Sequence, residues 1–271
     1  MLMYPEIEKI AFELGPLKVH WYGLMYILGF GLGWLLLRYR SVRSQGVWTD
    51  EHVSDIVFFG ALGVILGGRI GYVLFYNFDQ FLIEPARIFY LWQGGMSFHG
   101  GLIGVLLAFA WFAKKHKKHY LDVADFVAPT IPVGLATGRL GNFINGELWG
   151  RATDMPWGMV FERVGGGPMP RHPSQLYELF LEGFVLLAAL WWFSSSPRRR
   201  GAVSGWFLIG YGVFRSFVEF FREPDAHLNF VAFGWMTMGQ ALCLPMILAG
   251  CALLFMRNEG CGAVCGSRPA S

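Results

Sequence analysis

Membrane-length apolar segments constrain this sequence more than any other feature. Seven such segments are near the ~20 residues that cross the hydrocarbon core of a bilayer. They lie at about 19–37, 55–76, 90–113, 124–143, 175–193, 203–221 and 235–256. Charged residues make up only 15% of the chain, against about 25% in soluble domains. The sequence therefore predicts an all-α polytopic membrane protein, a bundle of about seven transmembrane helices that forms a single membrane-embedded domain over residues 1–271.

The fourth segment and the connection after it depart from this regular pattern. Pro129, Pro132 and several glycines interrupt the segment. Such breaks are tolerated where neighbouring helices or a cavity satisfy the freed backbone groups. The only long connection follows at about 146–174 and contains the run Gly165-Gly166-Gly167-Pro168. We expect this connection to form a small extracytoplasmic head, or a lid.

Basic residues set the predicted orientation, because the connections richest in Lys and Arg face the cytoplasm. The richer set comprises Arg38, Arg40, Arg43, Lys114, Lys115, Lys117, Lys118, Arg198, Arg199, Arg200, Arg257 and Arg268. The N-terminus is therefore predicted outside and the C-terminus in the cytoplasm. The first eighteen residues lack the basic start and apolar core of a cleavable signal peptide, so we expect the first segment to stay in the membrane. The formal net charge of +3 gives no reason to expect nucleic-acid binding.

Polar side chains within the segments gather toward the predicted outer side. They are Arg69, His99, Arg139, Asn142, Glu178, Glu182, Tyr211, Arg215 and Glu219. Ionisable groups at membrane depth are costly and usually face a polar cavity with a function. Three of them, Tyr211, Arg215 and Glu219, are spaced i, i+4, i+8 and share one helix face. The pattern predicts a site that is open to the extracytoplasmic surface.

The stretch 138–151 is the densest of these features. It ends the fourth segment with Arg139, two asparagines and Glu147 among four glycines. Glycines let a ligand approach the backbone closely and permit conformations that other residues cannot hold. The stretch therefore predicts a pocket for an anionic group at the edge of the bilayer.

Each of these residues also has a structural interpretation. Arg215 and Glu219 would form an ion pair that locks one helix, and Arg69 would satisfy backbone carbonyls. The two glutamates that open the fifth segment are expected to pair with arginines rather than perform acid–base work. A buried histidine is usually a hydrogen-bonded structural residue, but the position of His99 beside Gly100-Gly101 favours a functional role.

The cysteines give no evidence for a metal or disulfide framework. Cys243, Cys251, Cys261 and Cys265 all lie in the last segment or the tail after it, on the predicted cytoplasmic side, where disulfides are rare. No metal cluster or nucleotide motif is apparent, so we expect no cofactor. Any reacting thiol would arrive with the substrate.

Six stretches rich in Gly, His, Arg and aromatic residues lie in a fixed order along the chain. They are 20–26, 67–72, 99–101, 138–151, 171–178 and 211–219. In these stretches and their order the chain resembles the bacterial phosphatidylglycerol–prolipoprotein diacylglyceryl transferase family over most of its length. The resemblance implies transfer of a diacylglyceryl group from phosphatidylglycerol to the lipobox cysteine thiol of a prolipoprotein, with release of glycerol phosphate. It also implies a multi-pass enzyme of the bacterial cytoplasmic (inner) membrane with its active site toward the extracytoplasmic side.

The resemblance implies roles for particular residues. Arg139 and Arg215 would hold the phosphate through charge-assisted hydrogen bonds that strengthen as it leaves. A thiol of pKa about 8.5 is mostly protonated at neutral pH, so His99 is the candidate base, and Tyr22 would orient it or the lipid head group. The expected substrate-binding residues are Arg139, Asn142, Asn145, Glu147, Gly150, Arg69, Tyr211, Glu219 and Gly100.

Two other functions remain open from the sequence. An arginine-lined cavity could serve an anion or lipid channel or transporter, although no polar stripe continues into the inner half of the bundle and no internal repeat is apparent. A phospholipid hydrolase would use His99 with water and would differ only in the acceptor.

Overall fold

The computed structural model describes residues 2–5, 7–15, 17–90, 94–223, 230–232 and 236–256. The chain divides into two compact units. The first unit comprises Met1–Leu36 and Asp125–Cys265, and the second is built mainly from Leu37–Ala124.

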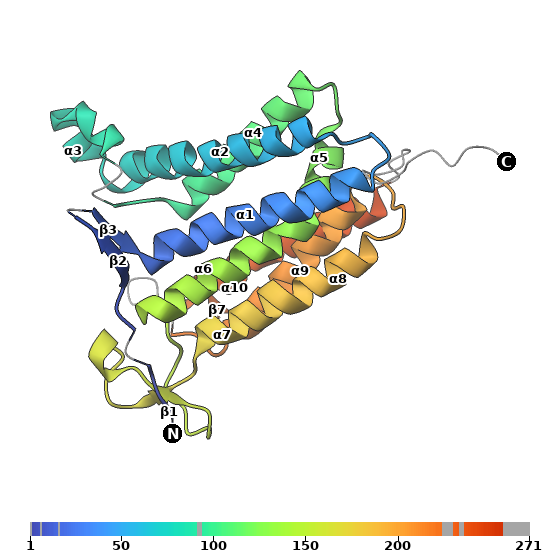
Figure 1. Cartoon of the computed structure of the whole chain (residues 1–271). Coiled ribbons are helices and arrows are strands. Elements are labelled where there is room, and N and C mark those ends of the chain that lie inside the picture. Colours follow the sequence, from blue (N-terminus) through green and yellow to red (C-terminus); the bar gives the residue numbers. More distant parts are fainter. Residues whose placement is uncertain are drawn as a thin grey trace. The chain divides into compact units, whose positions relative to one another are not determined.

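Most of the first unit is a set of packed helices (Figure 1). They are α1 (Trp21–Val42, of which the first part belongs here), α6 (Ile131–Asn145), α7 (Ser174–Glu178), the π-helix Leu179–Val185, α8 (Leu186–Phe193), α9 (Ala202–Val218) and α10 (Met238–Phe255). Helix α9 packs along α10, and α6 packs against α7 and the π-helix. Small residues allow α1 to approach α6 closely, because a Cβ on Gly29 would lie 2.5 Å from Thr137 Oγ1.

Proline breaks the fourth expected segment, as the sequence predicts. Helix α5 (Tyr120–Val127), the 3-10 helix Ala128–Thr130 and α6 follow each other, with Pro129 and Pro132 at the junctions. Proline fits the first turn of a helix because its missing N–H has no partner there in any case. The break shortens α6, which ends beside the long connection.

The second unit contains two long helices joined by a glycine-rich contact. Helix α2 (Asp50–Tyr76) begins at Thr49, which forms a capping box with His52, and leads to the short α3 (Phe78–Ile83) and a 3-10 helix (Pro85–Phe89). Helix α4 (Phe98–Lys115) then packs against α2. A Cβ on Gly67 would lie 2.3 Å from the carbonyl oxygen of Gly100. Small residues of this kind let membrane helices approach at backbone distance.

Short strands supplement the helices, so the fold is not purely α-helical. Strand β1 (Leu2–Met3) runs parallel to β4 (Met159–Val160), and β4 runs antiparallel to β5 (Pro170–Arg171). Strands β2 (Ile10–Leu14) and β3 (Leu17–His20) form one hairpin, and β6 (Phe230–Ala232) and β7 (Met236–Thr237) form another. The predicted head therefore contains a small sheet, and the N-terminal strand completes it.

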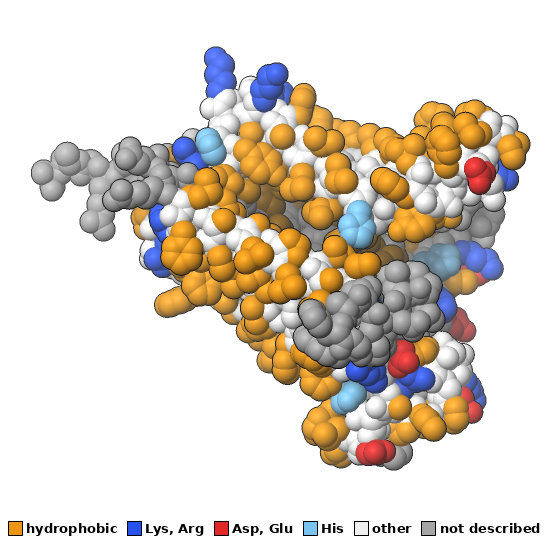
Figure 2. Space-filling model, turned by 180° about the vertical axis from the view of Figure 1, so that it is seen from behind, with side chains coloured by type: hydrophobic (Ala, Val, Ile, Leu, Met, Phe, Trp, Pro, Cys, Tyr) orange, Lys and Arg blue, Asp and Glu red, His pale blue; other side chains and the backbone are white. Residues whose placement is uncertain are grey.

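Three helical stretches are long and apolar enough to cross a membrane within the described part of the chain: Asp50–Tyr76, Ser174–Phe193 and Met238–Phe255. Ala202–Val218 is a shorter apolar helix. Figure 2 shows hydrophobic side chains over the visible faces of the helices, and many large ones are exposed, including Phe75, Trp192 and Phe255. Each expected segment overlaps a helix, but the third was predicted to begin too early, because α4 starts only at Phe98. The crossing of all seven and their orientation stay predictions.

Candidate active site

A buried carboxylate, Glu178, is the centre of an arginine cluster in the first unit. Its side chain is fully buried, and Arg139 Nε lies 2.7 Å from its Oε2. Arg215 and Arg222 both donate to its Oε1, the latter at 3.1 Å. Three guanidinium groups therefore share one carboxylate, and the prediction that Glu178 pairs with arginine is confirmed.

A second carboxylate, Glu219, extends this cluster along α9 and onto α10. Arg215 Nη2 lies 2.9 Å from Glu219 Oε2, and Arg222 Nε lies 3.6 Å from the same oxygen. The hydroxyl of Thr237 donates to Glu219 Oε1 at 3.0 Å, while Thr237 also caps α10. The expected Arg215–Glu219 pair thus exists, but it is part of a larger network rather than an isolated lock within one helix.

A chain of amides leads from the arginine cluster to the end of α6. Arg139 Nη1 donates to Asn142 Oδ1 at 3.2 Å, and Asn142 Nδ2 donates to Glu147 Oε1 at 2.8 Å. Asn145 Nδ2 lies 3.4 Å from the same carboxylate oxygen. The sequence predicted that these four residues form one pocket, and the structure brings them together.

The turn that carries Glu147 is built from residues with unusual backbone geometry. Gly146 has φ +67° and ends α6 in the left-handed conformation, which glycine adopts without strain. Leu148 has φ +60°, an uncommon value for a side chain of its size. Ser174 Oγ donates to the Leu148 carbonyl at 3.0 Å, and Gln175 Nε2 donates to the Glu147 carbonyl at 2.6 Å. Two side chains from α7 therefore hold this turn in place.

Gly150 lies where the head connection passes between two other backbone segments. Its N–H donates to the His172 carbonyl at 2.8 Å, and the N–H of Arg151 donates to the Phe221 carbonyl at 2.9 Å. A Cβ on Gly150 would lie 2.3 Å from the Phe221 carbonyl oxygen. Only glycine fits this backbone crossing, which ties the head connection to the end of α9.

Two tyrosines from the predicted site also belong to the first unit. Tyr22 packs on Gly141 of α6, its hydroxyl lies 3.3 Å from that of Tyr26, and it interacts electrostatically with Glu147 and Arg139. Tyr211 stacks on Phe207, with ring centroids 6.0 Å apart, and interacts electrostatically with Arg215 and Arg139.

The remaining predicted residues, Arg69, His99 and Gly100, lie in the second unit. Arg69 donates to the carbonyls of residues 87, 88, 94 and 95, which matches its structural interpretation. Gly100 lies in the close contact between α2 and α4. His99 is exposed in the first turn of α4, and its ring meets Phe98 edge to face at 5.6 Å between centroids.

Several residues that order the site were not singled out from the sequence. Arg222 follows α9 and was not among the expected site residues, while Ser174 and Gln175 open an expected segment of apolar character. The i, i+3 spacing of Glu219 and Arg222 could have indicated the ion pair. The contacts of Ser174 and Gln175 with residues about 26–28 positions away leave no periodic signal in the sequence.

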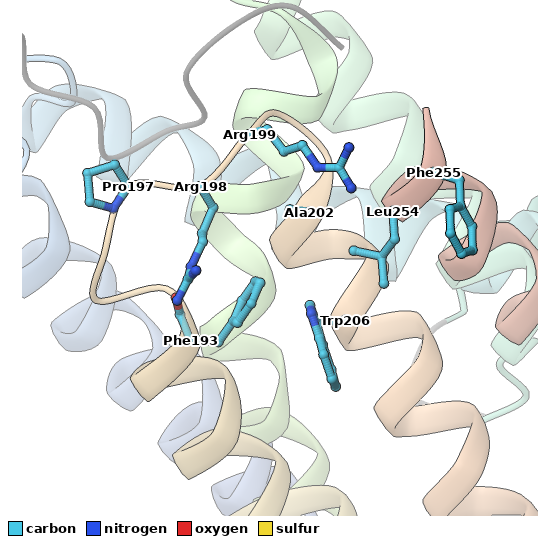
Figure 3. A pocket seen from close by; sticks show the side chains of 8 residues that line it. All are labelled: Phe193, Pro197, Arg198, Arg199, Ala202, Trp206, Leu254 and Phe255. Atoms are coloured by element: carbon cyan, nitrogen blue, oxygen red, sulfur yellow. The ribbon is translucent and has the colours of Figure 1, made fainter. Parts of the chain in front are cut away.

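A separate cavity of about 600 Å³ lies at the other end of α8, α9 and α10 (Figure 3). Its walls include Phe193, Trp206 and Phe255, together with Arg198 and Arg199. The Arg198 guanidinium lies 4.2 Å from the Phe193 ring centroid, and its Nε donates to the Phe193 carbonyl at 2.8 Å. These contacts close the turn between α8 and α9, and none of the described residues that line the cavity is a carboxylate. The arginine cluster remains the stronger candidate for chemistry.

Fold and site define a class: a helical membrane protein with an arginine–carboxylate site at one end of its apolar helices. The family model for prolipoprotein diacylglyceryl transferase matches residues 9–256. The chain is 57% identical over 254 residues to the phosphatidylglycerol–prolipoprotein diacylglyceryl transferase of Pseudomonas aeruginosa (strain LESB58), covering 94% of this chain and 95% of that protein. It is 58% identical over 250 residues to the enzyme of the same name from Coxiella burnetii (strain RSA 331 / Henzerling II), covering 92% and 95%. The chain belongs to the prolipoprotein diacylglyceryl transferase family and is a transferase.

Proposed function

We propose that this chain transfers the diacylglyceryl group of phosphatidylglycerol to the lipobox cysteine thiol of a prolipoprotein. The observation that carries the proposal is the pair of arginines, Arg139 and Arg215, that Glu178 holds at one end of apolar helices. Guanidinium groups bind phosphate through several N–H donors in a fixed plane. An anchored pair of them suits a phosphate that enters from a membrane.

Within the described part of the chain, Arg139 uses only some of its hydrogen-bond donors. Its Nε meets Glu178 and one Nη1 N–H meets Asn142, while a guanidinium carries five N–H groups. The remaining donors would bind the phosphate oxygens. The carboxylate fixes the orientation of the guanidinium beforehand, which lowers the cost of ordering it when the lipid binds.

The glycerol head group would meet the amide chain at the end of α6. Asn145 Oδ1 and Gln175 Oε1 are buried and accept no hydrogen bond from the residues that the structure describes. Glycerol hydroxyls are donors that would satisfy such oxygens, and a buried acceptor without a donor costs roughly 1–3 kcal/mol. Glu147, which already accepts from Asn142, would orient the same group.

The chemistry then requires one bond to form and one to break. The thiol sulfur attacks the diacylglycerol carbon that carries the phosphate ester, the carbon–oxygen bond breaks, and glycerol phosphate leaves with the bonding electrons. Negative charge grows on the departing phosphate, so the arginines stabilise the transition state more than the bound lipid. The thiol proton goes to a base, and exposed His99 is the residue proposed for that step.

Labelled phosphatidylglycerol separates this proposal from its alternatives. Purified protein in lipid nanodiscs should move labelled diacylglycerol onto a lipobox peptide, and a matched peptide with serine in place of the cysteine should receive none. Release of diacylglycerol without peptide would indicate a hydrolase. Lipid or anion flux without either product would indicate a channel or transporter.

We also propose a cytoplasmic (inner) membrane location with the site facing the extracytoplasmic side. Pairing of β1 with β4 puts residues 2–3 beside the head connection, which agrees with a shared side for both. Reporter fusions after Arg43, Lys118 and Arg200 should report the cytoplasm, and fusions near Asp79 and Gly166 should report the outside. An inside signal at Gly166 would overturn the orientation.

A further inference from the structure

A second glutamate in the fifth segment, Glu182, has no role in the contacts described above. Its side chain is completely buried, with 0% exposure. Neither carboxylate oxygen has a hydrogen-bond partner among the residues that the structure describes. The prediction that it pairs with an arginine therefore does not match its hydrogen bonds. A buried carboxyl without donors is expensive and calls for a reason.

The backbone around Glu182 is also unusual. It lies in the π-helix Leu179–Val185, between α7 and α8. A π-helix inserts one residue into a helical turn, and such segments occur frequently at functional sites. The next residue, Gly183, contacts Ala136, since a Cβ there would lie 2.7 Å from the alanine Cβ. The π-helix thus packs directly on α6, the helix that carries Arg139.

Charged and titratable groups from every neighbouring helix act on Glu182. They are Arg139 from α6, Glu178 from α7, Tyr211 and Arg215 from α9, Arg222 beyond α9, and Cys243 from α10. Helix α8 carries no titratable residue. Glu182 is therefore an electrostatic member of the arginine cluster, although it is not hydrogen-bonded to it.

Counting charges shows what Glu182 could do. The cluster holds three arginines, and with Glu178, Glu219 and Glu182 ionised it is neutral. A bound phosphodiester adds one negative charge, and a net charge in a desolvated site is costly. Glu178 and Glu219 form salt bridges with the arginines, and protonation would weaken those contacts. Glu182 has no hydrogen-bond partner among the described residues, so it loses none when it takes up a proton.

We propose that Glu182 balances the charge of the site. It takes up one proton when the phosphate of phosphatidylglycerol binds, so that the arginine cluster stays neutral with and without lipid. This inference rests on the proposed function, because it requires a lipid phosphate at Arg139 and Arg215. Proton uptake by Glu182 would also make the site select the lipid over the glycerol phosphate product. A neutral Glu182 matches a singly charged phosphodiester, while the doubly charged glycerol phosphate product would leave the site with excess negative charge and favour its release.

Isothermal titration calorimetry in buffers of different ionisation enthalpy counts protons taken up on binding. With short-chain phosphatidylglycerol, the wild-type protein should take up about one proton per lipid bound. In the pH range where the lipid-free carboxyl is ionised, the affinity for the lipid should fall by about tenfold for each unit that the pH rises. Glu182→Gln fixes the neutral form. It should take up no proton through this site and should bind the lipid with an affinity that no longer depends on pH in this way.

Two controls make the test specific. Glu51→Gln alters an exposed carboxylate at the start of α2 and should keep the proton uptake of the wild type. Diacylglycerol with the same chains lacks the phosphate and should bind without proton uptake. If wild-type protein binds phosphatidylglycerol without taking up a proton, or if Glu182→Gln retains the uptake, the inference is wrong.

The wild-type measurement needs no variant, so a Glu182→Gln protein that fails to fold does not leave the question open. Failure of the proposed function has a different signature. Wild-type protein would then neither bind phosphatidylglycerol in an Arg139-dependent way nor transfer its diacylglyceryl group. Binding and transfer without proton uptake would reject only the role of Glu182.

Discussion

Each unit surrounds one arginine with hydrogen-bond acceptors, and the two arginines, buried Arg69 and partly buried Arg139, are held in opposite ways. In the second unit, Arg69 donates to four backbone carbonyls between residues 87 and 95. In the first unit, Arg139 is held by the carboxylate of Glu178 and by the side chain of Asn142. Backbone carbonyls cannot move away without unfolding the loop that carries them. Side-chain partners can share a guanidinium with a ligand, so the partner type distinguishes a structural arginine from one suited to substrate.

The largest expected effect tests whether the second unit contributes to chemistry at all. His99→Gln keeps hydrogen-bonding capacity but removes the base, so turnover should fall by roughly 10²–10⁴. Raising the pH should recover part of the loss, because more thiolate forms without help. Turnover and phosphatidylglycerol affinity should be measured together. If turnover and lipid affinity fall together and neither recovers at high pH, His99 is a positioning residue rather than a base.

The next effect concerns the arginine with side-chain partners. Arg139→Lys keeps the charge but loses the planar fork, and loss of one such contact to a developing charge lowers the rate by about 10²–10³. Steady-state transfer assays on folded protein would measure this. Near-normal turnover in both Arg139→Lys and Arg139→Ala would make Arg139 structural and leave the phosphate to Arg215.

Arg69→Lys is the matched variant in the second unit. A lysine cannot reach four carbonyls in one plane, and each buried acceptor left without a donor costs about 1–3 kcal/mol. We expect a lower thermal unfolding temperature with a much smaller change in turnover per folded molecule than Arg139→Lys gives. Unchanged stability with a raised KM for lipid would instead support the substrate-binding role expected from the sequence.

The smallest effect concerns the head connection. Burial lowers the pKa of His172 below its usual value, and its Nδ1 lies 3.0 Å from the Tyr177 hydroxyl. Because the unfolded chain then binds more protons than the folded one, stability rises with pH and falls as pH drops through about 6.5. The protection factor for amide hydrogen exchange at Gly150, which corrects for the intrinsic pH dependence of exchange, should fall modestly below that pH. The same pH response in His172→Gln would show that another group is responsible.

The parts of this molecule that the sequence predicts are those with a short-range or compositional signal. Apolar length predicted the helices, and Pro129 and Pro132 predicted the break before α6. The i, i+4 spacing predicted the Arg215–Glu219 pair. The N-terminal strand was not predicted, because two residues that pair with a strand more than 150 positions away leave no local pattern. Arg222 was missed for a related reason, since its main partner, Glu178, belongs to a different segment.

Gly100 shows how one residue type can mislead. The sequence interpretation placed it at the substrate, where glycine permits close approach of a ligand. In the structure the close approach is between two helices, because Gly67 and Gly100 bring α2 and α4 to backbone contact. A glycine in the sequence indicates that another group approaches the backbone closely, but only the fold shows whether that group is a ligand or another helix.

The parallel pairing of β1 with β4 has a consequence for the order of biosynthesis. Leu2 pairs with Met159, so β1 leaves the ribosome long before its partner strand β4 has been made. Contacts of such sequence separation form late, because closing the loop costs entropy before the contact stabilises it. The head sheet should therefore assemble after the early helices have inserted, and a nascent chain arrested before residue 159 should expose its first residues to protease.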